Sequence, residues 1–324
     1  MESEPSTTKR DVAPGGVNQS QAEAFLRERF GSDVRDVAPI GRGDWSRAFA
    51  FRLGGADCVA RFGAYHEDFA KDRLAAAYAS PNLPIPAVIE VGEALGGYYA
   101  VSERAFGGYI DDLGGAQMRA TVPSLFAALD AARSADLSGT TGYGGWGADG
   151  TAPYPSWRDV LADVAADRPG GRIGGWRERL TASEVGIGPF DEALGHLYNL
   201  LDCCPEERHL IHADLLHFNV LVAGNRITAV VDWGCAMYGD FLYDVAWFAF
   251  WWHRFPAWVG IDFVREATRH FAAIGLEVPD MAARLRCYQI HIGLDGQKYN
   301  AFTGDWDEVA AIARHTLAVA RDHG

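Results

Sequence analysis

The chain has 324 residues, of which 48% are hydrophobic and 22% are charged, and its formal net charge is −14. This composition is that of a globular protein, and the length allows one large or two medium domains. The excess of acidic groups would repel the phosphates of nucleic acids and anionic membranes, so we expect neither as a partner. The same charge suits a small cationic molecule, or it serves only solubility.

The chain has five cysteines, an odd number without a C-x-x-C pair. We therefore expect neither a disulfide framework nor a zinc site. The N-terminus has no apolar signal-peptide segment, and the most apolar stretch, residues 245–252, is too short to span a bilayer. These features favour a cytoplasmic protein, and we expect a monomer rather than an obligate oligomer.

The first part of the chain alternates polar and apolar stretches. Residues 1–17 are rich in Ser, Thr, Pro and Gly and are predicted to be a disordered tail. A helix is expected to begin near Ser20. The strand-like runs that follow are residues 48–53, 57–62, 87–91 and 97–102, with a helix and a proline-rich break between the second and third runs.

A glycine-bearing loop leads into the first of these strands. Its backbone N–H groups and Ser46 could cover phosphate groups. Arg61, on the second strand, is a cation that can bind phosphate through two hydrogen bonds; the alternative is an ordinary surface residue. We expect an acid on the next helix to orient this cation, namely Asp72, with Glu67 and Asp68 as alternatives.

The last of these strands ends before the turn Gly107-Gly108. This position is that of a hinge between two parts of the chain. The backbone groups of Ser102 and Arg104 are therefore expected to pair with an adenine ring.

A motif for chemistry lies in the second half of the chain. His212, Asp214 and Asn219 form a His-x-Asp-x-x-x-x-Asn pattern, followed by two apolar runs with a polar turn between them. The second run ends at Asp232. A β-hairpin here would fold the chain back and bring Asp214, Asn219 and Asp232 together.

Such a cluster is typical of phosphoryl transfer. The reaction needs a carboxylate to orient a hydroxyl group and oxygen ligands for Mg²⁺ on a triphosphate. We assign the first role to Asp214 and the second to Asn219 and Asp232, with ATP or GTP as the donor. The spacing, with Asp-Trp-Gly after the hairpin, matches the kinase catalytic loop and its metal-binding segment. The alternative, that these residues only form turns and end a strand, does not explain their spacing.

The last third of the chain is predicted to be mainly helical. Asp240 is expected to cap an aromatic-rich helix over residues 245–253, and Asp244 to brace the catalytic loop. This helix is either buried core or offers Trp251 as a wall for a sugar ring or cation. Asp295, on a helix over residues 281–299, either receives an ammonium group of the acceptor or faces solvent.

Several stretches carry a resemblance to a known family. The sequence resembles the aminoglycoside phosphotransferase family from about residue 22 to residue 299, and most closely its hygromycin B branch. The resemblance implies an α+β, two-lobed protein-kinase-like fold. A small β-rich nucleotide-binding lobe would span residues 18–103 and a larger, mainly helical catalytic and acceptor lobe residues 104–324. The stretches are SRAFAF (46–51), KDR (71–73), LPIP (83–86), SWRD (156–159), RHLIHAD (208–214), NRITAVVDW (225–233), AMYGD (236–240) and IGLD (292–295).

The resemblance also implies ATP-dependent transfer of phosphate to a hydroxyl of an aminoglycoside or aminocyclitol antibiotic. It assigns catalysis to Asp214, Mg²⁺ binding to Asn219 and Asp232, and phosphate binding to Arg61. Phe218 stands where the hygromycin B branch has a second asparagine, so the acceptor pocket lacks that amide. The alternatives are a kinase for a macrolide, a sugar, homoserine or a choline-like amine, and a non-catalytic nucleotide-binding protein.

Overall fold

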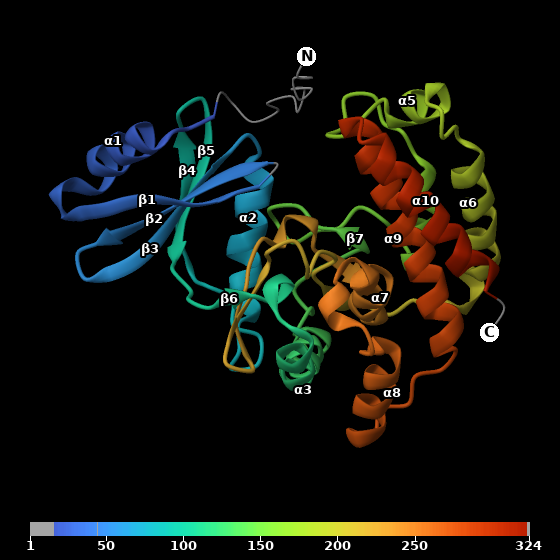
Figure 1. Cartoon of the computed structure of the whole chain (residues 1–324). Helices are drawn as coiled ribbons and strands as arrows, with labels where there is room; N and C mark the ends of the chain where they lie inside the picture. The colour runs from blue at the N-terminus through green and yellow to red at the C-terminus, as the bar shows by residue number, and fades with distance from the viewer. Residues whose placement is uncertain (1–15, 44, 323–324) are drawn as a thin grey trace, which may run out of the picture. The chain divides into compact units, whose positions relative to one another are not determined.

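The computed structural model describes residues 16–43 and 45–322, and the chain forms two compact units (Figure 1). The first unit comprises the described residues up to Ala76 together with Pro86–Arg104. The second comprises Ala77–Ile85 and the chain from Ala105 onward.

The first unit is built on a five-stranded antiparallel sheet with the strand order β1-β2-β3-β5-β4. Two-residue turns join β2 to β3 and β4 to β5, and a helix separates β3 from β4. The strands are β1 (Val34–Arg42), β2 (Ser46–Leu53), β3 (Ala56–Gly63), β4 (Val88–Ala94) and β5 (Gly97–Glu103), and the helices are α1 (Gln19–Phe30) and α2 (His66–Ala75).

One side of this sheet forms the core of the unit with α1. Phe51 and Phe62 are almost fully buried against Leu26 of the helix. Asn18 and Gln21 form a capping box that fixes where α1 begins. Val17, which the sequence places in the tail, is only 8% exposed and belongs to this core. Residues 1–15 of the predicted tail lie outside the described residues.

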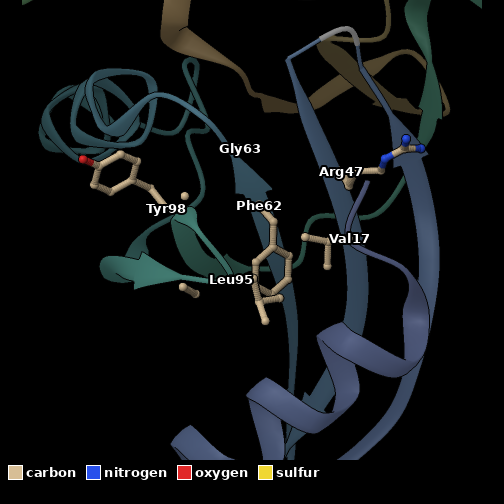
Figure 2. A pocket seen from close by; sticks show the side chains of 8 residues that line it. Val17, Arg47, Phe62, Gly63, Leu95 and Tyr98 are labelled. Atoms are coloured by element: carbon tan, nitrogen blue, oxygen red, sulfur yellow. The ribbon is translucent and has the colours of Figure 1, made fainter. Parts of the chain in front are cut away.

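A small pocket opens beside this core (Figure 2). Its lining includes Phe62 and Val17, with Tyr98 and Arg47 at its sides. Neighbouring residues of a strand point to opposite faces of a sheet, so Arg61 and Phe62 face different sides of β3. The pocket is therefore separate from the Arg61 face of the sheet.

The second unit contains two small three-stranded sheets, with the orders β10-β9-β6 and β7-β11-β8. The hairpin of β9 and β10 pairs Val220 with Val230 and Ala223 with Arg226, and Gly224 adopts φ +61° in its turn. The strands are β6 (Gly108–Tyr109), β7 (Gly144–Gly145), β8 (His209–Ile211), β9 (Val220–Ala223), β10 (Arg226–Val230) and β11 (Met237–Gly239).

Helices make up most of the second unit, and α9 is packed against α6, α7 and α10 (Figure 1). In the part of the chain that the structure describes, no helix is long and apolar enough to cross a membrane. The helices are α3 (Gly115–Arg133), α4 (Trp157–Ala162), α5 (Trp176–Ala182), α6 (Gly188–Leu200), α7 (Leu242–Trp251), α8 (Phe263–Ala273), α9 (Met281–Thr303) and α10 (Trp306–Arg321).

Two boundaries differ from the sequence-based expectation. The aromatic-rich helix expected over residues 245–253 is α7, which begins at Leu242 and ends at Trp251, and its first turn is buried. Ala77–Ile85 belongs to the second unit rather than to the first lobe. The backbone N–H of Val230 donates to the carbonyl oxygen of Pro84 at 2.8 Å, which ties this segment to the hairpin.

A buried ion pair joins α9 to the segment before α7. Asp240 is fully buried and accepts two hydrogen bonds of 2.8 Å from Arg284, and a further one from the hydroxyl of Tyr288. It also accepts the N–H of Leu242 at 3.1 Å, but the N-cap position of α7 is Phe241, so Asp240 is not the cap that the sequence predicted. Asp240 therefore joins two elements of the core in addition to its contact at the start of α7.

Candidate active site

The two side chains expected to bind phosphate, Ser46 and Arg61, lie together with Asp72 in the first unit. Nη1 of Arg61 donates to Oδ2 of Asp72 at 2.6 Å, and its Nη2 donates to Oγ of Ser46 at 3.4 Å. The guanidinium also lies over the ring of Phe69, 5.5 Å from its centroid. Of the acids considered on α2, Asp72 makes this ion pair with Arg61. An arginine fixed in this way presents a preoriented cation.

The expected hinge residues are already engaged in the sheet. Ser102 lies in β5 between Val59 of β3 and Val88 of β4. The backbone N–H of Arg104 donates to the carbonyl oxygen of Asp57 at 3.0 Å. That N–H is therefore not available to an adenine ring.

The catalytic loop begins after β8 and is held by one buried carboxylate. Asp244, near the start of α7, accepts the backbone N–H of His212 at 2.9 Å and that of Ala213 at 2.8 Å. Ala213 adopts φ +61°, a left-handed conformation that costs energy for a residue other than glycine. Burial raises the pKa of Asp244, while the two N–H groups and His212 oppose that shift. Asp244 thus fixes a strained turn directly before Asp214.

His212 links this turn to the hairpin. Its Nε2 lies 3.0 Å from the carbonyl oxygen of Val231, to which it donates, so Nδ1 is free to accept the N–H of Asp214 at 3.2 Å. The ring packs edge-to-face against Trp233, with the centroids 4.7 Å apart. These contacts place the backbone of Asp214 relative to β10.

Both carboxylate oxygens of Asp214 have a hydrogen-bond partner within the same loop. Oδ1 lies 2.8 Å from Nδ1 of His217, and Oδ2 accepts Nδ2 of Asn219 at 3.1 Å. Asn219 also donates to the carbonyl oxygen of Asp214 at 2.8 Å. Desolvation opposes the charged form of His217, but the bond to Asp214 prevails and raises the pKa of the imidazole. The carboxylate is therefore held in one orientation, with lone pairs left for a hydroxyl group.

The hairpin brings Asn219 and Asp232 to one end of the β9–β10 pair. The N–H of Val231 donates to the carbonyl oxygen of Asn219 at 2.9 Å, directly before Asp232. Asp232 itself has φ +62° and ψ +68°. Such strained conformations cluster at functional sites. In the described residues, four of the seven left-handed non-glycine residues lie in this region, namely Ala213, His217, Phe218 and Asp232.

The donor set at this end fits a magnesium ion bound together with a nucleotide. The amide nitrogen of Asn219 is engaged by Asp214, so its oxygen is the atom that it can offer to a cation. Asp232 supplies a carboxylate. Within residues 16–43 and 45–322, no group of three or more His, Cys, Asp or Glu side chains could hold a metal by itself. Mg²⁺ commonly binds through one or two protein ligands and completes its shell with phosphates and water.

The residues expected to contact the acceptor lie near the catalytic loop. Trp251 is 8% exposed, and its ring centroid lies 6.1 Å from that of His217. On α9, a Cβ at Gly296 would lie 3.5 Å from the Trp251 ring, and Asp295 is the preceding residue of the helix. Asp295 is exposed and pairs with Lys298 at 3.0 Å. The Trp251 ring is therefore mostly buried, while the Asp295 carboxylate is exposed.

The sequence motif does not indicate two residues of the site, His217 and Asp111. His217 lies inside the His-x-Asp-x-x-x-x-Asn pattern at a position that the pattern leaves open. Asp111 is more distant, and its carboxylate accepts the backbone N–H groups of His217 and Phe218 at 2.7 and 3.1 Å. The exposed ring of Phe218 meets Tyr109 edge-to-face, with the centroids 5.2 Å apart. Only the folded chain brings these distant segments together.

Known proteins are similar to this chain in sequence and fold. A model described as the phosphotransferase enzyme family matches residues 37–284. Hygromycin-B 4-O-kinase of Escherichia coli is 36% identical over 309 residues, which cover 94% of this chain and 86% of that protein. The structure of aminoglycoside phosphotransferase APH(4)-Ia has a TM-score of 0.82 at 33% identity, covering 95% of this chain and 100% of that one.

A ternary complex of a thermostable mutant of the same enzyme, with AMP-PNP and hygromycin B, has a TM-score of 0.81 at 34% identity and covers 93% of this chain and 98% of that one. Spectinomycin phosphotransferase, at 11% identity and a TM-score of 0.58, covers 94% of this chain and 98% of its own and shares the fold alone. The α+β, protein-kinase-like fold expected from the sequence is therefore confirmed.

Proposed function

The chain belongs to the phosphotransferase enzyme family, and on that premise we propose that it transfers the terminal phosphoryl group of ATP to a hydroxyl of an aminoglycoside or aminocyclitol antibiotic. The main support for the proposal is the geometry of the catalytic loop. Asp214 is fixed through both carboxylate oxygens, beside Asn219 and the end of the hairpin. The relatives that bind hygromycin B and a nucleotide analogue support the choice of acceptor class.

Each residue has a separate part in the reaction. Asp214 orients the acceptor hydroxyl and takes its proton as the oxygen attacks phosphorus. Arg61, held by Asp72, counters the charge of the phosphates. Asn219 and Asp232 would hold Mg²⁺, which supplies charge neutralisation on the triphosphate when it is bound. Asp244 keeps the loop before Asp214 in its strained conformation.

A cationic acceptor is consistent with the charge of the chain. The net charge of −14 attracts antibiotics with several ammonium groups over long range. Asp295 offers an exposed carboxylate on α9. Phe218 presents an exposed apolar ring there instead of the amide of the hygromycin B branch. The proposal therefore extends to relatives of hygromycin B whose sugar or cyclitol ring can lie against an aromatic face.

The direct test is release of ADP from MgATP in the presence of a panel of aminoglycosides and aminocyclitols, hygromycin B included, with mass spectrometry of the products. We expect a mass gain of one phosphate on at least one compound. Binding of MgATP without transfer to any compound of the panel would contradict the proposed acceptor class.

Salt dependence separates a cationic acceptor from a neutral one. For an acceptor with several ammonium groups, kcat/KM should fall as ionic strength rises, because salt screens the long-range attraction. A sugar or a macrolide with little charge should show no such fall. Equal salt dependence for charged and neutral acceptors would contradict the role of the negative charge.

A further inference from the structure

The backbone next to the catalytic carboxylate is strained and is held from a distant part of the chain. His217 and Phe218 have φ values of +62° and +71°, so two consecutive non-glycine residues are left-handed. Each such residue is strained and persists only where its surroundings impose the conformation. The chain must therefore supply a restraint at this point.

Asp111 is that restraint. It lies in the short helical turn Ile110–Asp112, directly after β6. Its Oδ1 accepts the N–H of His217 at 2.7 Å, and its Oδ2 accepts the N–H of Phe218 at 3.1 Å. One carboxylate thus satisfies two consecutive N–H groups, which the left-handed turn directs to the same side. Charge-assisted bonds of this kind are stronger than those between neutral groups.

Because the backbone of His217 is held in place, its imidazole ring is also positioned, and the ring contacts Asp214. Nδ1 lies 2.8 Å from Oδ1 of Asp214, and because a carboxylate only accepts, Nδ1 carries the proton. Asn219 holds the other oxygen of Asp214. Together the two donors prevent rotation of the carboxylate about its Cβ–Cγ bond.

We propose that Asp111 and His217 are positioning residues, which hold the Asp214 carboxylate in the orientation that receives the acceptor hydroxyl. The inference rests on the proposed phosphotransferase function, in which Asp214 is the catalytic residue. Neither positioning residue needs to touch the substrates. Misplacement of a reacting group by about 1 Å can cost about 100-fold in rate, so the contribution of such a restraint is measurable.

A different role for the His217 ring would be packing alone. Its centroid lies 6.3 Å from that of Trp247 and 6.1 Å from that of Trp251, in edge-to-face contacts. Three substitutions separate packing from positioning. Phenylalanine keeps a ring and loses the donor. Asparagine has an N–H donor at the place of Nδ1, whereas glutamine has one nearer to Nε2.

The experiment measures kcat and the KM for MgATP and for the acceptor in His217→Phe, His217→Gln and His217→Asn. We expect kcat to fall about 10-fold to 100-fold in the first two, with the KM for MgATP unchanged. His217→Asn should recover most of the lost kcat. Asp111→Asn should lower kcat in the same way, while the matched control Asp112→Asn, an exposed neighbour in the same turn, should not.

The results separate this inference from the proposed function. A wild type that phosphorylates its acceptor, together with an unchanged or faster His217→Phe, would overturn the positioning role alone. Equal loss in the asparagine and phenylalanine variants would assign His217 to packing.

A wild type without transferase activity would overturn the proposed function. The hydrogen bond between His217 and Asp214 would then be tested by nitrogen NMR of the histidine side chains, which shows which ring nitrogen carries the proton. Protonated Nδ1 in His217, altered by Asp111→Asn, would support the restraint; an unprotonated Nδ1 would overturn it.

Discussion

The guanidinium of Arg61 donates to the carboxylate of Asp72 at 2.6 Å, and both side chains are more than four-fifths buried. Strand β3 carries the cation and α2, the next element, carries the acid. The short connection between strand and helix explains how the sequence brings the two charges together. An arginine held in this way loses little freedom when it meets a phosphate group, which is the advantage of preorganisation.

Removal of this cation should weaken nucleotide binding more than it slows the reaction of bound substrates. We expect Arg61→Ala to raise the KM for MgATP at least about 10-fold, since a charge-assisted hydrogen bond contributes about 1.5–3 kcal/mol. Arg61→Lys should recover only part of this, because lysine lacks the planar fork. The control is Arg52→Ala, an exposed arginine of β2. An unchanged KM in Arg61→Ala would contradict the assignment.

The catalytic carboxylate should behave in the opposite way. Asp214→Asn retains the size of the side chain and loses the base, so we expect kcat to fall about 100-fold to 10,000-fold. Affinity for MgATP, measured by calorimetry, should change little. Asp202→Asn, at a fully exposed position, is the matched control. Near wild-type turnover in Asp214→Asn would show that another group accepts the proton.

The parts of the site that sequence could predict are local ones. Asp214 and Asn219 lie in one loop, and a hairpin of short strands returns the chain to Asp232, so spacing alone brings them together. The link from Arg61 to Asp72 spans one strand end and one helix. In each case a single turn or connection determines the geometry, and residue patterns report such connections well.

Contacts between distant segments could not be predicted in this way. Asp111 lies 106 residues before His217, and no local pattern indicates that its carboxylate meets that backbone. Arg284 is likewise 44 residues from Asp240, which the sequence presents only as a helix cap. Directly after β5, the N–H of Arg104 is used by Asp57, which the sequence pattern did not indicate. Tertiary packing decides these pairings, and it has no fixed period in the sequence.

Removal of one partner of the buried pair of Asp240 and Arg284 should strongly destabilise the second unit. Both side chains are at most 5% exposed. Arg284→Ala would leave a buried carboxylate without its cation, which costs about 3–5 kcal/mol. The double variant Asp240→Asn with Arg284→Met should be less destabilised than Arg284→Ala, because no buried charge remains. Urea unfolding measures both. A loss below about 1 kcal/mol in Arg284→Ala would be that of an exposed ion pair and would contradict this account.

Acid should destabilise the protein through two histidines that are neutral when folded. Burial lowers the pKa of His291 to about 4. Burial and the adjacent His253 lower the pKa of His315 to about 4. The centroids of the two imidazole rings lie 4.0 Å apart. The unfolded chain binds these protons near pH 6.5, so the free energy of unfolding should fall as the pH drops from about 6.5 to about 4. For the buried His291 the loss is about 3 kcal/mol.

The variant that tests this is His291→Gln, in which the side chain cannot take up a proton. Its urea midpoint should fall less steeply than that of the wild type between pH 6.5 and 4, although the lost hydrogen bond from Tyr243 lowers its stability at neutral pH. The matched control is His66→Gln, an exposed histidine in the first unit, which should retain the full acid slope. If His291→Gln and the wild type lose stability in parallel over this range, the acid sensitivity arises from other groups, and the burial of a neutral imidazole against Tyr243 has no part in it.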